Sequence, residues 1–433
     1  MQIWKLRFFS IWTGQTLSAF GTVVAQFALV WWITKLTGSA TVLASVTAAA
    51  LIPALLVSPF AGVFVDRHNR RLIMIVSDAF IALVSLWLAY QFWTGAMQLW
   101  HVYAAAVARA LGSAFYGPAC SASVTLLVPK EQYGRIGGID QTRSGVLEVV
   151  GPLLGALAIA WFPLHHVMLL DVGTAAFAII PLLIFSIPQP KPESSATDGG
   201  SSYWQDLAAG FLYVVRWRSL MLFVGVVAIV NIMLFSSTSL TPLLVYKGFG
   251  GEAGMLAWFQ SGFGFGLIAG GLALSLWGGP RRKILAVLGG IVGLGGILLV
   301  PAWTPASLWW LAVGGYALLG LTFAIAQGNM SAAFRGLVAP SKQGRFYSLL
   351  SPLFQGLNPL GIMVAGTVSD AVGIRFWFAV AGVVLMFAGI AGLAFSPLRR
   401  IEQEAREAQE AQEAQQTAGF ESADRVRAAR SLD

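Results

Sequence analysis

The stretch Gly62-Val-Phe-Val-Asp66-Arg67-His68-Asn69-Arg70-Arg71 lies between two apolar runs, at about residues 42–65 and 72–93. Its four charged side chains cannot lie in hydrocarbon, so it forms a short turn at a membrane surface. Three of the four are arginines, and an excess of Arg and Lys marks the cytoplasmic side of a membrane. The stretch therefore predicts two membrane-spanning helices and fixes their orientation.

The composition of the whole chain is that of a polytopic membrane protein. It has 433 residues, of which 57% are hydrophobic and 11% are charged, whereas a soluble domain carries about 25% charged residues. The net charge is +8, but the cations are scattered through short connections, so we expect anionic lipids as their partner rather than nucleic acid. The single cysteine, Cys120, excludes an internal disulfide.

The apolar runs predict an all-α protein, because a spanning helix needs about 20 mainly apolar residues. Eleven or thirteen spans remain alternatives, through merging or splitting around Pro118, Pro129 and Pro242. We expect twelve transmembrane helices, at 8–34, 42–65, 72–93, 99–127, 137–161, 166–187, 219–245, 254–277, 283–302, 306–334, 346–368 and 374–396.

The distribution of Lys and Arg tests this topology. With both termini in the cytoplasm, the outer connections hold only Lys35, Lys247 and Arg375, and the inner connections hold the others that lie outside the spans and the tail. This strong asymmetry predicts a multi-pass protein of the cytoplasmic (inner) membrane with both ends inside.

Connection lengths divide the chain into two halves. The longest internal connection is a polar linker at residues 188–218, between a six-helix bundle at 1–187 and a second at 219–396. A Glu-, Ala- and Gln-rich cytoplasmic tail follows at 397–433, and its role is either regulatory or merely solubilising.

The motifs of nucleotide-driven pumps and of metalloenzymes are absent from the sequence. It has no Gly-x-x-x-x-Gly-Lys-Ser/Thr and no His-Glu-x-x-His, and its four histidines lie in or near loops. We therefore expect no enzyme activity, no metal site and no cofactor.

Ionisable and amide side chains inside the predicted spans are the candidate site residues, because a charge in a membrane is costly unless it is paired or faces a cavity. The charged ones all fall in the first half: Asp78, Arg109, Asp140, Arg143, Glu148 and Asp171. For a lipophilic substrate, we expect a cavity with hydrogen-bonding points at Gln15, Gln26, Asn231, Gln260, Gln327, Gln355 and Asn358.

Depth predicts a contact between Arg109 and Glu148. At 1.5 Å per residue, Arg109 lies roughly 14 Å below the outer face and Glu148 roughly 20 Å above the inner one. In a core about 30 Å thick these levels nearly coincide, so the two side chains are expected to interact directly or through water. Such a pair is either a proton switch or a static link between two helices.

Three further carboxylates have weaker assignments. Asp140 and Arg143 lie at i and i+3, so they could pair as an inner gate or as an interfacial anchor. Asp171 is expected near the outer third of its helix, where it could contact a cationic substrate. Asp78 lies about two turns from Arg71 and is expected to bind the basic turn.

Several motifs give the chain a family resemblance. The opening stretch, Ser58-Pro59-Phe60-Ala61-Gly62 before it and Ser77-Asp78 after it resemble the major facilitator superfamily, in the macrolide-efflux-like branch of the drug exporters. Arg109-Ala-Leu-Gly112 and Gly151-Pro152-Leu-Leu-Gly155 resemble motifs of proton-coupled exporters, although a downstream glutamine-glycine pair and two of the usual glycines are missing.

The resemblance implies a major facilitator fold and a monomeric secondary transporter. Its expected partners are a lipophilic small molecule, protons and membrane lipids, and its expected activity is proton-coupled efflux by alternating access. Glu148, Arg109, Asp171, Asp140 and Arg143 are the candidates for proton coupling. Alternatives are an exporter of one endogenous metabolite (a siderophore or a lipid-like molecule), a proton-coupled importer, or a non-transporting receptor or scaffold.

The charged turn has two interpretations. It is either a conformational latch, in which the arginines bridge to neighbouring helices in one state only, or a basic loop that only sets topology. Because an acidic residue contributes little to topology, we favour a latch formed by Gly62, Asp66, Arg67, Arg70, Arg71 and Asp78.

Overall fold

Long helices running in alternating directions build the molecule. The computed structural model describes residues 3–188, 217–280, 282–338 and 340–395, so the predicted linker lies mostly, and the predicted tail wholly, outside the described residues. The first six helices are α1 (Ile3–Thr37), α2 (Ala40–Arg67), α3 (Arg70–Trp93), α4 (Leu99–Leu127), α5 (Tyr133–Trp161) and α6 (Leu164–Ile184). The other six are α8 (Arg218–Ser239), α10 (Ala253–Trp277), α11 (Lys283–Trp303), α12 (Trp309–Leu337), α13 (Pro340–Val372) and α14 (Ile374–Ala394).

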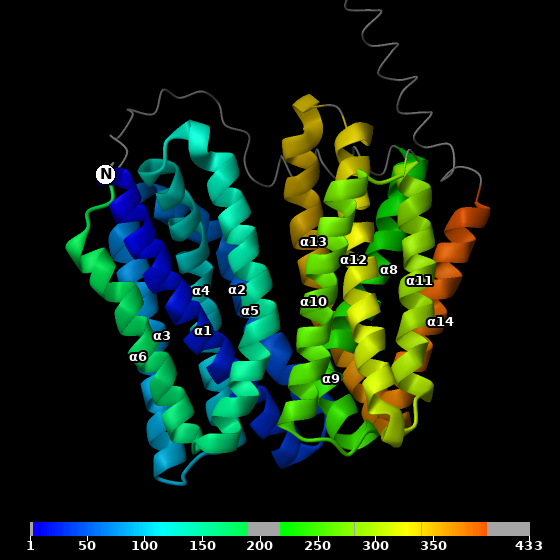
Figure 1. Ribbon diagram of the computed structural model, residues 1–433, viewed down its shortest axis with the longest axis horizontal. Coiled ribbons are helices and arrows are strands. Elements are labelled where there is room, and N and C mark those ends of the chain that lie inside the picture. Colours follow the sequence, from blue (N-terminus) through cyan, green and yellow to red (C-terminus); the bar gives the residue numbers. More distant parts are fainter. Residues whose placement is uncertain (1–2, 189–216, 281, 339, 396–433) are drawn as a thin grey trace, which may run out of the picture.

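Each predicted span corresponds to one long helix, with a break near Pro242. There α8 ends at Ser239, and a short α9 (Thr241–Leu243) and the π-helical η2 (Leu244–Gly248) follow. Ten of the described helices are long and apolar enough to cross a membrane by that criterion alone. The two more polar ones, α4 and α13, extend over the same height as the others (Figure 1).

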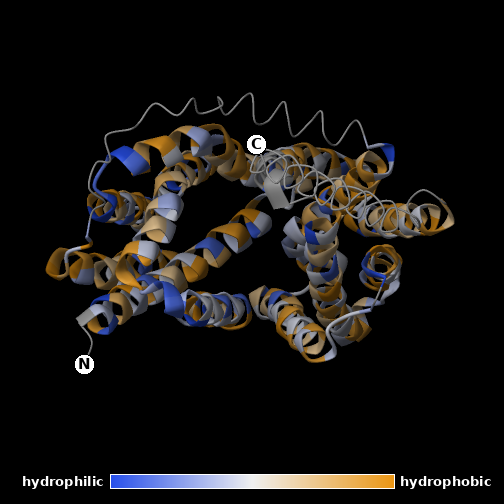
Figure 2. Ribbon diagram, turned by 90° about the horizontal axis from the view of Figure 1, so that it is seen from above, coloured by the Kyte–Doolittle hydropathy of each residue, from blue (hydrophilic) through white to orange (hydrophobic). Residues whose placement is uncertain are grey.

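The helices pack into two bundles that stand side by side. α1 to α6 pack among themselves, as do α8 and α10 to α14, and the main contacts between the sets are α2 with α13 and α5 with α10. Viewed along the helices, apolar residues predominate on the periphery of both sets (Figure 2). Large apolar side chains such as Leu276, Phe387 and Phe60 are exposed, as expected for a protein in contact with lipid.

Short connections are stabilised by local caps. Ser39 accepts a hydrogen bond from the backbone N–H of Val42 at the start of α2, and Asn69 accepts one from Leu72 at the start of α3. Gly278 ends α10 with a positive φ of 77°, which an L side chain adopts only with strain. These caps allow the chain to reverse within a few residues at each end of the bundles.

Glycines set the spacing of helices in the second bundle. The sequence places Gly262, Gly266 and Gly270 four residues apart on α10, and this spacing predicts a close helix contact. A Cβ at Gly266 would lie 1.9 Å from the carbonyl oxygen of Ala317 on α12, so the close contact is confirmed. The sequence repeats this spacing at Gly289 and Gly293 on α11, but a Cβ at Gly289 would meet nothing within 4 Å, so the close contact expected there is absent.

Candidate functional site

A central cavity lies between the two bundles. Its volume is about 720 Å³, within the range of about 300–1,000 Å³ that is typical of small-molecule sites. Its wall is formed by residues of α1, α2, α4 and α5 from the first bundle and of α8, α9, α10 and α12 from the second. Apolar side chains predominate, and the charged side chains in the wall are those of Arg109 and Glu148.

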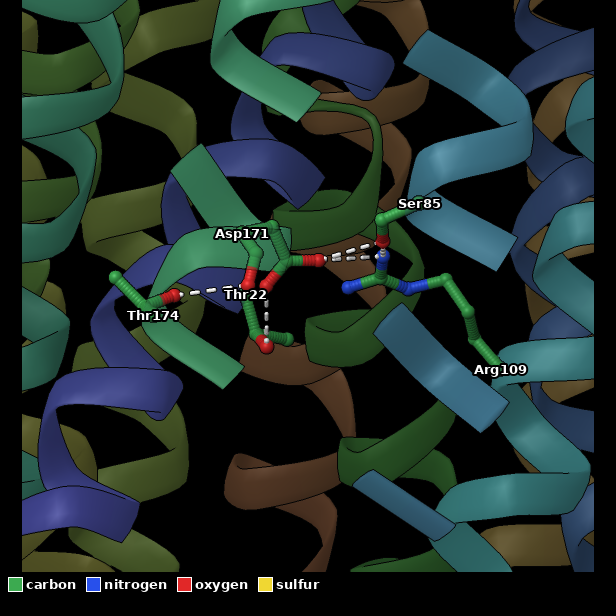
Figure 3. Close-up of polar contacts among 5 residues, drawn as sticks. All are labelled: Thr22, Ser85, Arg109, Asp171 and Thr174. Carbon is green, nitrogen blue, oxygen red and sulfur yellow. Dashed lines mark hydrogen bonds and ion pairs between the residues drawn. The ribbon is translucent and has the colours of Figure 1, made fainter. Parts of the chain in front are cut away.

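Arg109 is held by a buried polar cluster rather than by Glu148. Its Nη1 lies 2.9 Å from Oδ2 of Asp171 and 2.6 Å from Oγ of Ser85 (Figure 3). The same carboxylate accepts hydrogen bonds from Ser85 Oγ at 2.7 Å and from Thr22 Oγ1 at 3.0 Å. The cluster therefore ties α1, α3, α4 and α6 together through one buried ion pair.

The predicted pair of Arg109 with Glu148 is replaced by this cluster. Both side chains line the same cavity, but Glu148 has no ion-pair partner among the described residues. The expectation that Asp171 contacts substrate is also wrong for this conformation, because Asp171 is 2% exposed and is satisfied by Arg109, Ser85 and Thr22. Arg109 and Glu148 line the same cavity, but the depth argument did not identify Asp171 as the partner of Arg109.

Glu148 lies at a contact between the two bundles, where α5 packs against α10. A Cβ at Gly264 of α10 would be 3.2 Å from Cβ of Glu148 and 3.0 Å from its carbonyl oxygen. The next residue of α5, Val149, accepts a hydrogen bond of 2.6 Å at its backbone carbonyl from Ser261 Oγ of α10. The Glu148 side chain is exposed to the cavity beside this contact. A change at Glu148 can therefore act on the position of one bundle relative to the other.

A second buried cluster connects Gln15, Asp78 and Tyr116. Gln15 Nε2 donates to Asp78 Oδ2 at 2.9 Å, and Gln15 Oε1 accepts from the Tyr116 hydroxyl at 2.6 Å. Two expectations are thereby corrected. Asp78 binds Gln15 instead of the basic turn, and Gln15 lies in the core of the first bundle instead of lining the central cavity.

The pair expected between Asp140 and Arg143 is also absent from the described contacts. Asp140 Oδ1 instead accepts a hydrogen bond of 2.7 Å from the indole Nε1 of Trp12 on α1. Nε of Arg143 is buried and has no hydrogen-bond partner among the described residues. The Asp140 carboxylate points toward α1, so the i, i+3 spacing did not predict its hydrogen-bond partner.

The other predicted cavity amides are divided between two spaces. Gln26 and Gln260 line the central cavity, whereas Asn231 and Gln327 line a smaller cavity inside the second bundle. Gln355 and Asn358 line neither of these two cavities.

The contacts described for Arg70 and Arg71 of the charged turn lie within the first bundle. Arg70 pairs with Asp66 at 3.5 Å across the turn. Arg71 donates to the backbone carbonyls of Leu182 and, at 2.7 Å, Leu183, at the end of α6. Those carbonyls have no partner within their own helix, so Arg71 acts as a cap for α6.

The latch assignment of Gly62 and Arg67 remains a prediction. A Cβ at Gly62 would meet nothing within 4 Å, and the Arg67 side chain is exposed. In this conformation, neither residue has a described contact that would bridge the bundles.

At the opposite end, Asp370 of α13 caps the N-terminus of α2. Its carboxylate accepts hydrogen bonds from Ser39 Oγ at 2.6 Å and from the backbone N–H groups of Ala40 and Thr41 at 2.8 and 2.9 Å. Burial raises the pKa of Asp370, but the hydrogen bonds outweigh it and lower the pKa below its ordinary value of 3.8. Sequence reasoning missed this contact because the only local signal is an acidic residue next to an apolar helix end.

Comparison with known proteins decides the family. The family model of the Major Facilitator Superfamily matches residues 11–358 and, in a second match, 235–430. The chain belongs to the major facilitator superfamily. It is thus a membrane transporter, and the predicted fold of twelve spanning helices in two six-helix bundles is confirmed.

Relatives of this superfamily member include efflux proteins. Macrolide efflux protein A of Streptococcus pyogenes is 27% identical over 92% of this chain and 98% of that protein. Macrolide efflux protein A of Enterococcus faecalis is 28% identical over 75% of this chain and 100% of that protein. Multidrug efflux pump Tap of Mycobacterium tuberculosis is 23% identical over 89% and 92%, respectively. The predicted resemblance to the macrolide-efflux-like branch is therefore confirmed.

Solved structures support the same fold. A bacterial homologue of the iron transporter ferroportin, in an inward-facing state, superposes with a TM-score of 0.69 at 14% identity, covering 90% of this chain and 99% of that one. The nucleoside transporter NupG gives a TM-score of 0.62 at 14% identity, covering 92% and 100%. At this level of identity, the likeness concerns the fold alone.

Proposed function

We propose that this transporter exports lipophilic small molecules across the cytoplasmic membrane in exchange for protons, by alternating access. The observation that carries the proposal is the central cavity, whose apolar wall contains one carboxylate, Glu148, without an ion-pair partner among the described residues. The relatives named as macrolide and multidrug efflux proteins support export as the direction and drug-like molecules as the substrate class.

The closed end of the cavity is the outer one in this proposal. The basic turn between α2 and α3 is assigned to the cytoplasm by its arginines, so the end where Asp370 caps α2 faces outward. The conformation is then inward-facing, and the substrate enters from the cytoplasm or the inner leaflet. Export requires the contacts of α2 with α13 to separate while the inner ends of the bundles approach each other.

Glu148 is the proposed coupling group. The charge of Arg109 is compensated by Asp171 in this conformation, which leaves Glu148 as the uncompensated charge of the wall. Its carboxylate can carry a proton or accept a cationic group of the substrate, but not both at once. Because Glu148 lies beside the contact of α5 with α10, this exchange is placed to bias the movement of the bundles.

A flux assay in proteoliposomes with imposed pH gradients tests the proposal. We expect the wild type to move lipophilic compounds against the proton flux and Glu148→Gln to lose this pH dependence at normal expression. Glu131→Gln, which changes an exposed carboxylate in the turn just before α5, is the matched control and should transport normally. Full efflux by Glu148→Gln with an unchanged pH dependence would contradict the role of this residue.

The same assay separates the alternatives. An importer would accumulate compounds along the proton gradient, and an exporter of one endogenous metabolite would ignore most of a drug panel. The proposal also includes the domain bounds, which are two bundles at 1–187 and 219–396, a linker at 188–218 and a cytoplasmic tail at 397–433. It further includes a monomeric state and contacts with anionic lipids.

A further inference from the structure

A side pocket of about 150 Å³ lies inside the second bundle, next to the central cavity. Residues of α8, α10, α11 and α12 form its wall. Thr238 and Phe263 line both spaces, so the side pocket and the central cavity share one boundary. The rings of Phe263 and Phe323 lie 6.3 Å apart at this boundary, at an interplanar angle of 36°.

The wall of the side pocket combines apolar and amide groups. Val230, Leu294 and their neighbours supply branched aliphatic surface. Asn231 donates its amide N–H to the carbonyl of Val227 at 3.3 Å, which leaves its oxygen available. The Gln327 side chain has no hydrogen-bond partner among the described residues. Amide groups within an apolar wall can hold a ligand by burying its apolar part and hydrogen-bonding its polar substituents.

The size of the side pocket matches one aromatic ring. An apolar cavity of about 150 Å³ in a protein interior is large enough to bind benzene. The pocket also lies near Glu148, because Phe263 directly precedes Gly264, whose added Cβ would be 3.2 Å from Cβ of Glu148. One small molecule can therefore reach from the carboxylate to the pocket.

We propose that the side pocket binds a ring-sized apolar arm of the transported molecule, while a cationic group of the same molecule lies near Glu148. This inference rests on the proposed function and deepens it, because it specifies the substrate class as lipophilic cations that carry an aromatic or similarly sized ring. Phe263, at the boundary, stacks on the arm as it enters, and Gln327 and Asn231 bind polar substituents of the ring.

Matched probes test the side pocket directly. Hexyltrimethylammonium and benzylhexyldimethylammonium carry the same charge and alkyl chain and differ by one ring. Their dissociation constants are measured by titration calorimetry on the full-length protein in lipid nanodiscs. We expect the benzyl compound to bind the wild type roughly tenfold more tightly, because its ring is removed from water.

Two variants change the pocket in opposite directions. Val230→Phe fills it, so the two compounds should bind about equally. Leu294→Ala enlarges it, so a naphthylmethyl analogue, which is too large for the wild type, should gain affinity relative to the benzyl compound. Val383→Phe is the matched control, because Val383 is 57% exposed on the outside of α14 and its replacement should leave the preference for the ring unchanged.

The outcomes separate this inference from the proposed function. If Val230→Phe keeps the wild-type preference, if Leu294→Ala leaves the naphthylmethyl analogue unaffected, or if neither probe binds the wild type, the side pocket is not a binding site. If the binding pattern is as expected but proteoliposomes show no flux under a pH gradient, the side pocket stands and proton-coupled export is wrong.

Discussion

The capping contact between Asp370 and α2 gives a prediction whose size can be worked out. Asp370→Ala removes the acceptor for Ser39 Oγ and for two backbone N–H groups at a helix N-terminus. Loss of a helix cap costs about 0.5–2 kcal/mol, and this carboxylate is largely exposed, which weakens its charge interactions. We therefore expect the contact between the outer ends of α2 and α13 to be about 2 kcal/mol less stable in Asp370→Ala. This difference corresponds to an increase of about 30-fold in the ratio of molecules with these ends apart to molecules with them in contact.

Distances between spin labels measure this shift. Labels at Leu36→Cys and Val372→Cys, in a Cys120→Ser background, report the separation of the outer ends of α1 and α13; both sites are exposed. In Asp370→Ala the population with a long distance should increase.

Glu252→Gln is the matched control for this measurement. It breaks a different contact between the bundles at this end, the ion pair Lys35–Glu252 at 3.2 Å. Its partners are 47% and 75% exposed, so the pair contributes about 0–1 kcal/mol. The reasoning is refuted if Asp370→Ala leaves the distance distribution unchanged or if Glu252→Gln shifts it equally.

Three more predictions concern charge and packing. Asp171→Asn leaves a buried arginine without its counter-charge, so it should lower stability by about 3–5 kcal/mol, whereas Asp66→Asn, which changes a carboxylate that is 73% exposed, should change the melting temperature little. Gly266→Ala forces apart two helices in close contact and should cost about 1–3 kcal/mol in thermal unfolding, while Gly271→Ala, where a Cβ meets nothing within 4 Å, should be neutral. Because the Asp370 carboxylate has a lowered pKa, its stabilisation is complete above 3.8 and is lost only as the pH falls through that lower value; with the proposed coupling group removed, in a Glu148→Gln background, the spin-label distances should therefore not change between about pH 5 and 8.

The course of the chain could be predicted from the sequence because hydropathy, helix length and arginine placement act locally. The turn from Asp66 to Arg71 lies between α2 and α3 as expected, and only the break near Pro242 modifies a predicted span. Each span must satisfy its own backbone hydrogen bonds in lipid, so its existence does not depend on its neighbours.

The partners of the buried charges could not be predicted, because they depend on helix rotation and tilt. Depth along a helix is readable at 1.5 Å per residue, and it brought Arg109 and Glu148 to the same level. The direction in which each side chain points is set by packing, which turns Arg109 toward Asp171 and Ser85. The hydroxyl of Ser85 carries no sequence signal that separates it from serines on other faces.

The buried charges of the first bundle join its helices to one another. Arg109 with Asp171 and Gln15 with Asp78 are buried contacts that join α1, α3, α4 and α6. Breaking such contacts is costly, so they favour a bundle that moves as one body. Movement then has to occur between the bundles, where an exposed carboxylate joins them, as at Asp370, or where one carboxylate faces the passage, as at Glu148. The buried charges thus stabilise the moving body, and the exposed ones are placed to direct its movement.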